Sequence, residues 1–185
     1  MADSFKSSGV IEVRIRELAQ LFNSLDPSPF HERDLDQDAE EYIFGWAREL
    51  STDIPLRIVV HLPESEARNA AELGLAAALA NYFAERAQIQ ERELNELFRI
   101  GRRYLLVGIP VLVACLVGSQ LAHRQLGSGP LANAIAESLI LVGWVANWKP
   151  IETFLYDWLP LKRRRNLYHR LANATLEIKS LTSST

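Results

Sequence analysis

The sequence has a single cysteine and little of what marks unusual protein classes. Its 185 residues include one Cys, nine Gly and eight Pro. One cysteine cannot form an intramolecular disulfide, and this glycine and proline content excludes a collagen-like or low-complexity chain. Because 48% of the residues are hydrophobic, the chain is also not wholly disordered.

The small net charge of −3 conceals two halves of opposite sign. Residues 1–98 carry 19 acidic and 9 basic side chains, a net of −10, whereas residues 99–185 carry 4 and 11, a net of +7. An acidic first half disfavours nucleic acid as a partner, because it repels phosphates. It predicts instead a basic protein partner in the cytosol, bound in a salt-sensitive way.

The longest stretch without a charge covers residues 104–122 and reads YLLVGIPVLVACLVGSQLA. As a helix it would be about 28 Å long, close to the ~30 Å of a bilayer's hydrocarbon core. No polar stripe interrupts it, as one would in a soluble amphipathic helix. We therefore expect a first transmembrane helix here.

A second apolar stretch covers residues 131–148 and contains one acidic residue, Glu137. Residues 123–130 between the two stretches are rich in turn-forming residues, which predicts an external turn and a helical hairpin. Glu137 makes the second span weaker than the first, and a re-entrant or interfacial segment is the alternative.

Basic residues flank the two spans on the same side. Arg99, Arg102 and Arg103 precede the first span, and Lys149, Lys162, Arg163, Arg164 and Arg165 follow the second. The positive-inside rule then predicts both termini in the cytoplasm, in a membrane of the bacterial inner (plasma) type. The cluster 162–165 also suits anionic lipid headgroups.

Residues 149–160 follow the second span and are bracketed by Pro150 and Pro160. Their apolar side chains fall on one helical face, which predicts an amphipathic helix at the membrane surface, although packing on the protein's own soluble part is an alternative. The expected membrane-interface anchors are aromatic: Trp144, Trp148, Phe154, Tyr156 and Trp158. Residues 161–185 are expected to form a basic cytoplasmic tail helix, with Leu167, Leu171, Ala174 and Ile178 on one face.

Residues 1–64 are expected to form a small cytoplasmic module of mixed structure. Alternating apolar and polar residues predict strands at 10–17 and 55–63, and helical spacing predicts short helices at 18–25 and 38–50. Asp34, Asp36 and Asp38 alternate like the start of a calcium loop, but Ala39 and Gly45 stand where that loop requires Gly and Glu. We therefore expect these acids to cap the helix that follows.

Residues 65–103 lack proline and predict one long helix that runs into the first span. Apolar residues at 3,4 spacing from Leu73 to Leu97 resemble a coiled-coil seam, and a second stripe at Leu75, Leu79, Tyr82 and Ile89 suggests burial on two sides. The expected fold is thus an α+β membrane protein with a β-α-α-β-α module followed by the hairpin. Two strands alone leave open edges, which predicts a homo-oligomer.

Polar residues within the spans are the sharpest functional candidates: Glu137, Asn133, Asn147 and Gln120. The sequence shows no recognisable catalytic motif and no metal-ligand spacing, so we expect no enzyme, no metal and no cofactor. The leading hypothesis is an oligomeric scaffold or anchor in the lipid bilayer that presents the acidic module to a partner. The alternative is a small oligomeric conduit for ions or solutes with Glu137 in the membrane path.

Overall fold

The computed structural model describes residues 9–127 and 129–181. The chain divides into two compact units, which are described separately. One unit, here called the α/β module, consists of the chain up to Gln90 together with the chain from Arg163 onward. The other, here called the hairpin unit, is Glu91–Lys162.

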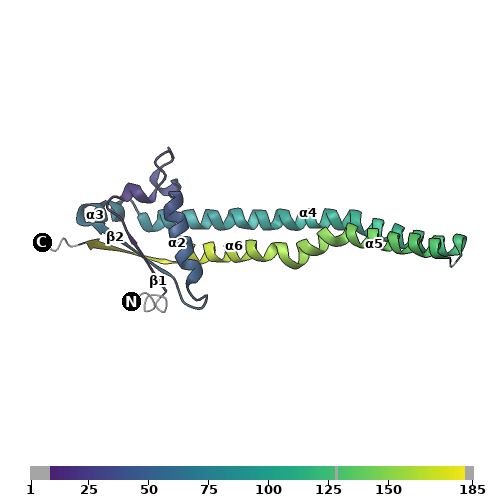
Figure 1. Ribbon diagram of the computed structural model, residues 1–185. Helices are drawn as coiled ribbons and strands as arrows, with labels where there is room; N and C mark the ends of the chain where they lie inside the picture. The colour runs from purple at the N-terminus through teal and green to yellow at the C-terminus, as the bar shows by residue number, and fades with distance from the viewer. Residues whose placement is uncertain (1–8, 128, 182–185) are drawn as a thin grey trace. The chain divides into compact units, whose positions relative to one another are not determined.

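The α/β module contains a three-stranded parallel sheet in the order β1-β2-β3. The strands are β1 (Val10–Arg14), β2 (Arg57–Pro63) and β3 (Thr175–Leu181). The two strands predicted from alternation are confirmed, and they pair with Ile11 opposite Ile58. Figure 1 shows β3, in yellow, beside the blue β2, although more than a hundred residues separate the two strands in the sequence.

The third strand corrects the expected tail helix. Helix α6 is Trp158–Ala172, and the chain then becomes β3 instead of remaining helical to residue 179. Leu176 and Ile178 alternate with Glu177 and Lys179, so a period-two pattern is present, and the second edge of β2 supplies hydrogen-bonding partners. Residues 182–185 at the expected frayed end lie outside the described residues.

One face of the sheet forms the core of the module. Leu56, Ile58, Val60 and Leu62 share the predicted face, and all four are buried. Helical segments that contribute to the same core include α2 (Gln37–Glu49), α3 (Glu64–Glu72), the first turns of α4 (Leu75–Leu126) and the end of α6. The helix expected at 18–25 is only a 3-10 turn, Leu18–Leu21. A separate 3-10 turn follows at Phe30–Glu32.

The expected long helix is broken near its start. Helix α3 (Glu64–Glu72) ends at Leu73, and α4 begins at Leu75 after Gly74, whose φ of +73° is in the left-handed region. Glycine adopts this conformation without the cost that a Cβ brings. Of the predicted seam, Leu73 and Ala76 are exposed but Phe83, Ala87 and Leu94 are buried, and Leu75, Leu79 and Tyr82 of the second stripe are buried as well. Beyond the break, α4 continues into the apolar run as predicted.

The connection between β2 and β3 contains the whole hairpin unit. Parallel neighbours require a crossover, because a tight turn would reverse the chain. Between β1 and β2 the crossover contains α2, but between β2 and β3 it contains α3, α4, α5 (Pro130–Glu152) and α6. The hairpin unit is therefore an insertion whose two ends both return to the same module.

Helices α4 and α5 run in opposite directions within the hairpin unit (Figure 1). The expected separate helix at 149–160 is wrong in its boundaries. Helix α5 continues through Pro150 to Glu152, a π-helical turn covers Thr153–Asp157, and α6 follows at once. Pro160 does not end the helix: it lies in the first turn of α6, directly after the π-helical turn, and α6 continues to Ala172.

Candidate functional site

Two helical segments are long and apolar enough to cross a membrane by length and composition: Leu75–Leu126 and Pro130–Ala172. The predicted spans 104–122 and 131–148 lie within them. Most of their apolar side chains point outward; Leu106 is 74% exposed and Val145 is 73% exposed. An apolar surface of this extent is unusual on a soluble monomer.

Small residues and one amide hold the two helices of the hairpin unit together. Asn147 is 6% exposed, and its Nδ2 donates to the carbonyls of Gly108 at 2.9 Å and Gly143 at 3.0 Å. A Cβ on Gly108 would lie 2.7 Å from the Asn147 Oδ1, so only glycine fits there. Cys115 is also buried between the two helices. It faces Gly143 closely: a Cβ added to that glycine would lie 3.2 Å from the Cys115 Cβ. Asn147 therefore pairs helices, as polar side chains do in membrane bundles.

The four predicted polar candidates are not brought together. Asn147 faces inward, whereas Gln120, Asn133 and Glu137 are exposed on the outer surface of the hairpin unit. Asn133 and Glu137 share one face of α5, since they are four residues apart. Within this unit, no path is formed by the four residues of a single copy.

The predicted interface anchors divide into two groups. Trp144, Trp148 and Tyr156 are largely exposed. The half-buried Phe154 stacks on Phe98 with ring centroids 6.0 Å apart, and Trp158 donates to the Phe154 carbonyl at 3.0 Å.

The basic flanks of the spans are mostly exposed. Arg99, Arg102, Arg103 and Arg163 are solvent-accessible in their units. Lys162 lies over the Trp158 ring at 5.1 Å, and Lys149 pairs with Glu152 at 3.1 Å and Asp157 at 3.4 Å.

A partly buried polar cluster in the α/β module was not expected from the sequence. Glu40 on α2 has a side chain that is 13% exposed. Its Oε2 accepts from the Tyr82 hydroxyl at 2.6 Å and from Arg86 at 3.0 Å, and its Oε1 accepts from the Tyr168 hydroxyl at 2.8 Å. One carboxylate thus joins α2 to the start of α4 and to the end of α6.

The electrostatics of this cluster favour a structural role. Burial and then the hydrogen bond to Glu40 raise the pKa of Tyr82 and that of Tyr168 far above the usual value. Both hydroxyls therefore remain protonated donors at physiological pH. Both carboxylate oxygens of Glu40 thus accept hydrogen bonds from groups on other helices. The spacing of Tyr82 and Arg86 was visible in the sequence, but their partner on α2 was not.

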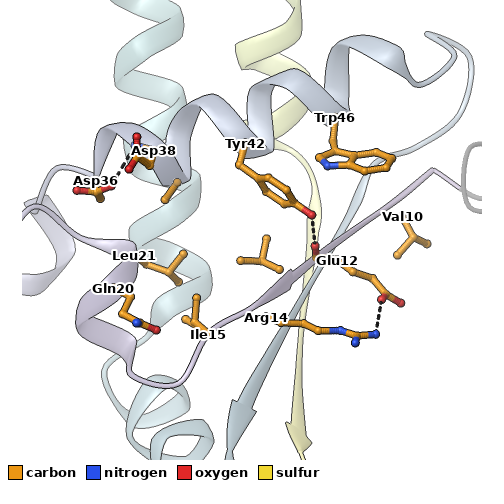
Figure 2. Close-up of a pocket in the computed structure, with 12 residues that line it drawn as sticks. Val10, Glu12, Arg14, Ile15, Gln20, Leu21, Asp36, Asp38, Tyr42 and Trp46 are labelled. Carbon is orange, nitrogen blue, oxygen red and sulfur yellow. Dashed lines mark hydrogen bonds and ion pairs between the residues drawn. The ribbon is translucent and has the colours of Figure 1, made fainter. Parts of the chain in front are cut away.

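A cavity of the module lies between the free edge of β1 and α2. It has a volume of about 720 Å³, and Figure 2 shows Tyr42 and Trp46 of α2 next to the strand. The Tyr42 hydroxyl donates to the Glu12 main-chain carbonyl at 3.2 Å. Here this cavity is called the edge groove.

Acidic and apolar groups share the wall of the edge groove. Asp36 caps α2 by accepting from the Asp38 N–H at 3.0 Å, so of the three acids expected to cap this helix Asp36 is the cap, and Asp38 lies in the first turn. Glu12 pairs with Arg14 at 3.5 Å and with His61 at 3.8 Å. Among the described residues, no group of three His, Cys, Asp or Glu side chains is arranged to hold a metal ion.

The charge of Glu40 is expected to stabilise the module. Glu40→Gln removes the charge that strengthens three hydrogen bonds, so we expect the free energy of unfolding of the module to fall by about 2 kcal/mol. The measurement is urea unfolding of the detergent-solubilised full chain, followed by proteolysis of the module.

Glu41→Gln is the matched control, because Glu41 is exposed and only accepts from the neighbouring Gln37 at 2.9 Å. Its effect should stay below about 0.5 kcal/mol. Equal losses from both variants would show that the cluster does not stabilise the module.

Comparison of this chain with protein-family models, with curated proteins and with solved structures finds no match. The function must therefore be inferred from the residues and their geometry.

Proposed function

We propose that the protein is a non-enzymatic, oligomeric scaffold or anchor of a bacterial-type inner membrane. The hairpin unit crosses the bilayer, and the α/β module lies in the cytoplasm, where it meets a partner. The observation that carries this proposal is the outward-facing apolar surface of the two long helices.

The physical argument for insertion concerns the solvent that this surface requires. Exposed Leu, Ile, Val and Phe side chains each favour the membrane by about 0.3–0.6 kcal/mol on the insertion scale. The uncharged run 104–122 therefore inserts favourably as a helix. The second helix carries Glu137 and is held by Asn147 against its neighbour, so it inserts as part of a hairpin.

The distribution of basic residues gives the proposed orientation. Arg102 and Arg103 precede the first span, Lys162 and its basic neighbours follow the second, and Arg124 is the only Arg or Lys in the turn. Both termini are then cytoplasmic. Trp144 and Trp148, exposed near the end of the second span, suit the headgroup level.

Membrane topology can be tested by cysteine labelling. In a Cys115→Ala background, Gln125→Cys should react with a membrane-impermeant maleimide on intact spheroplasts. Thr52→Cys, which is exposed in the module, should react only after lysis.

Release of the protein from membranes by alkaline carbonate would contradict the anchor. Labelling of residue 52 from outside would reverse the proposed orientation.

The partner of the module is proposed to be a basic cytosolic protein. The module as the structure defines it, residues 1–90 with 163–185, carries 17 acidic and 13 basic side chains, a net of −4, and this acidic surplus attracts cations. Such an attraction weakens as salt shortens the Debye length from about 10 Å at 0.1 M to about 3 Å at 1 M.

A lysine-rich model peptide tests this charge complementarity. We expect the full chain in detergent to bind it with an affinity that falls at least about tenfold between 0.1 M and 1 M salt, measured by fluorescence anisotropy. A glutamine-substituted peptide of equal length is the control. Equal binding of both peptides, or binding that salt does not change, would remove the basic partner from the proposal.

A second candidate function rests on the exposed position of Glu137. Its carboxylate and the amide of Asn133 lie on the outer face of α5, where a bundle of several hairpins would bring them together. In this alternative the assembly conducts ions or small solutes. We expect purified protein in liposomes then to give an ion flux that Glu137→Gln abolishes, with Gln125→Asn, outside the two predicted spans, as the control. Absence of flux from the assembled wild-type protein would exclude the conduit.

A further inference from the structure

The free edge of β1 has main-chain groups directed away from the sheet. Gly9 accepts from the Arg57 N–H at 2.9 Å, and the Ile15 N–H donates to His61 at 3.1 Å, so the odd-numbered positions bond to β2. Successive residues of a strand in a parallel pair direct these groups to opposite sides. Val10, Glu12 and Arg14 therefore point their N–H and C=O groups outward. Among the described residues, only the Glu12 carbonyl of these three has a partner on that side, the Tyr42 hydroxyl.

We propose that the edge groove receives β1 of a second copy of this chain, in antiparallel orientation and centred on Val13. In this register Glu12 lies opposite Arg14 of the partner subunit, and Arg14 lies opposite Glu12 of the partner subunit. Each such pair exchanges two main-chain hydrogen bonds, because all four residues direct their groups outward. The two three-stranded sheets become one sheet of six strands.

Charge selects this register from its neighbours. A shift of one residue would oppose outward and inward main-chain groups and would reverse the faces of the side chains. A shift of two residues would place Glu12 opposite Glu12 of the partner subunit, or Arg14 opposite Arg14 of the partner subunit. Like charges directly opposite each other destabilise a strand pair, whereas opposite charges stabilise it. The short sequence of β1 is thus complementary to itself in one register.

The surroundings of β1 accommodate the added strand. The edge groove of about 720 Å³ is walled by Tyr42 and Trp46, and Ile15 at its end is only half-buried. In the proposed register Ile15 lies opposite Ile11 of the partner subunit and continues the apolar layer. The Tyr42 hydroxyl can stay, since a carbonyl oxygen accepts two hydrogen bonds.

Strand β3 provides a comparison within the same sheet. Glu177 and Lys179 also alternate in charge, and they pair with each other at 3.6 Å. We favour β1 because the edge groove lies beside it and α2 forms a wall. This pairing gives a structural basis for the oligomer of the proposed scaffold. It rests on the proposed function in one respect: the modules of both copies must lie on the same side of the membrane.

Disulfide trapping in membranes tests the register. Two differently tagged full-length chains in a Cys115→Ala background carry Glu12→Cys and Arg14→Cys. Facing Cβ atoms in the proposed register are about 4.5–5.5 Å apart, whereas those one step along the face are about 7–8 Å apart. We expect the mixed disulfide to form at least about tenfold faster than either homodisulfide.

The matched control places Glu177→Cys and Lys179→Cys on β3 in two other chains. Faster trapping on β3 than on β1, or homodisulfides of Glu12→Cys as the main product, would overturn the proposal. Absence of any trapped dimer would also overturn it. Because labelling of residues 52 and 125 reports topology independently, failure of the pairing is distinguishable from failure of the membrane anchor.

Charge reversal separates pairing between copies from effects within one copy. Glu12→Arg alone puts Arg opposite Arg across the pair, and Arg14→Glu alone puts Glu opposite Glu, so each variant should self-associate about tenfold less than the wild type. A mixture of the two variants restores opposite charges at both positions.

We expect the two variants to form a mixed dimer in detergent, measured by co-purification of one tag with the other. A change that only damages folding cannot be restored by a second damaged chain. Failure of the mixture to associate, while the wild type does, would therefore refute the register.

Discussion

The pairing of β3 with β2 closes a crossover that contains the entire hairpin unit. Two parallel strands cannot be joined by a turn, so the chain must leave the sheet and return in the same direction. In this protein the excursion includes two helical segments long enough to span a bilayer. The register Ile58 to Leu176 and the burial of Leu167 and Leu171 hold the returning end in place. Without this contact β2 would have an open edge and the module would lose part of its core.

The Glu40 cluster complements the sheet on the helical side. Apolar contacts hold α2, α4 and α6 together but are not directional. The Glu40 carboxylate accepts hydrogen bonds from Tyr82, Arg86 and Tyr168, and these bonds form only in one arrangement of the three helices. The same helix carries Tyr42 on another face, where it covers part of the β1 edge. One helix therefore contributes both to the stability of the module and to the shape of the edge groove.

Local patterns in the sequence predicted the parts of this structure that depend on near neighbours. Alternation located β1 and β2, and the uncharged run located the continuous helix α4. The sequence predicts a helix where β3 forms. The spacing of Leu167, Leu171, Ala174 and Ile178 is compatible both with one continuous helix and with a helix followed by a strand. The choice is made by the open edge of β2, which is distant in sequence. The break at Gly74 arises from backbone conformation, which residue spacing does not report.

The candidate sites show the same limit. The Glu40 cluster and the edge groove are formed by residues from several elements, so the spacing of residues within one segment does not predict them. Asn147 was recognised as a polar residue within a span, but its role in pairing helices depends on Gly108 across the contact. Glu137 remains the residue for which sequence and structure agree most simply, as an exposed acid on an apolar helix.

The position of β3 at the end of the chain also determines an order of events during synthesis. A ribosome adds about 5–20 residues per second, and the N-terminal part of a chain folds first. Strands β1 and β2 and helix α2 emerge early, but Thr175–Leu181 emerges only after both apolar helices have been made. The third strand can therefore join the sheet only after both apolar helices have been synthesised. A chain truncated within the hairpin would have a two-stranded sheet with one edge of β2 exposed.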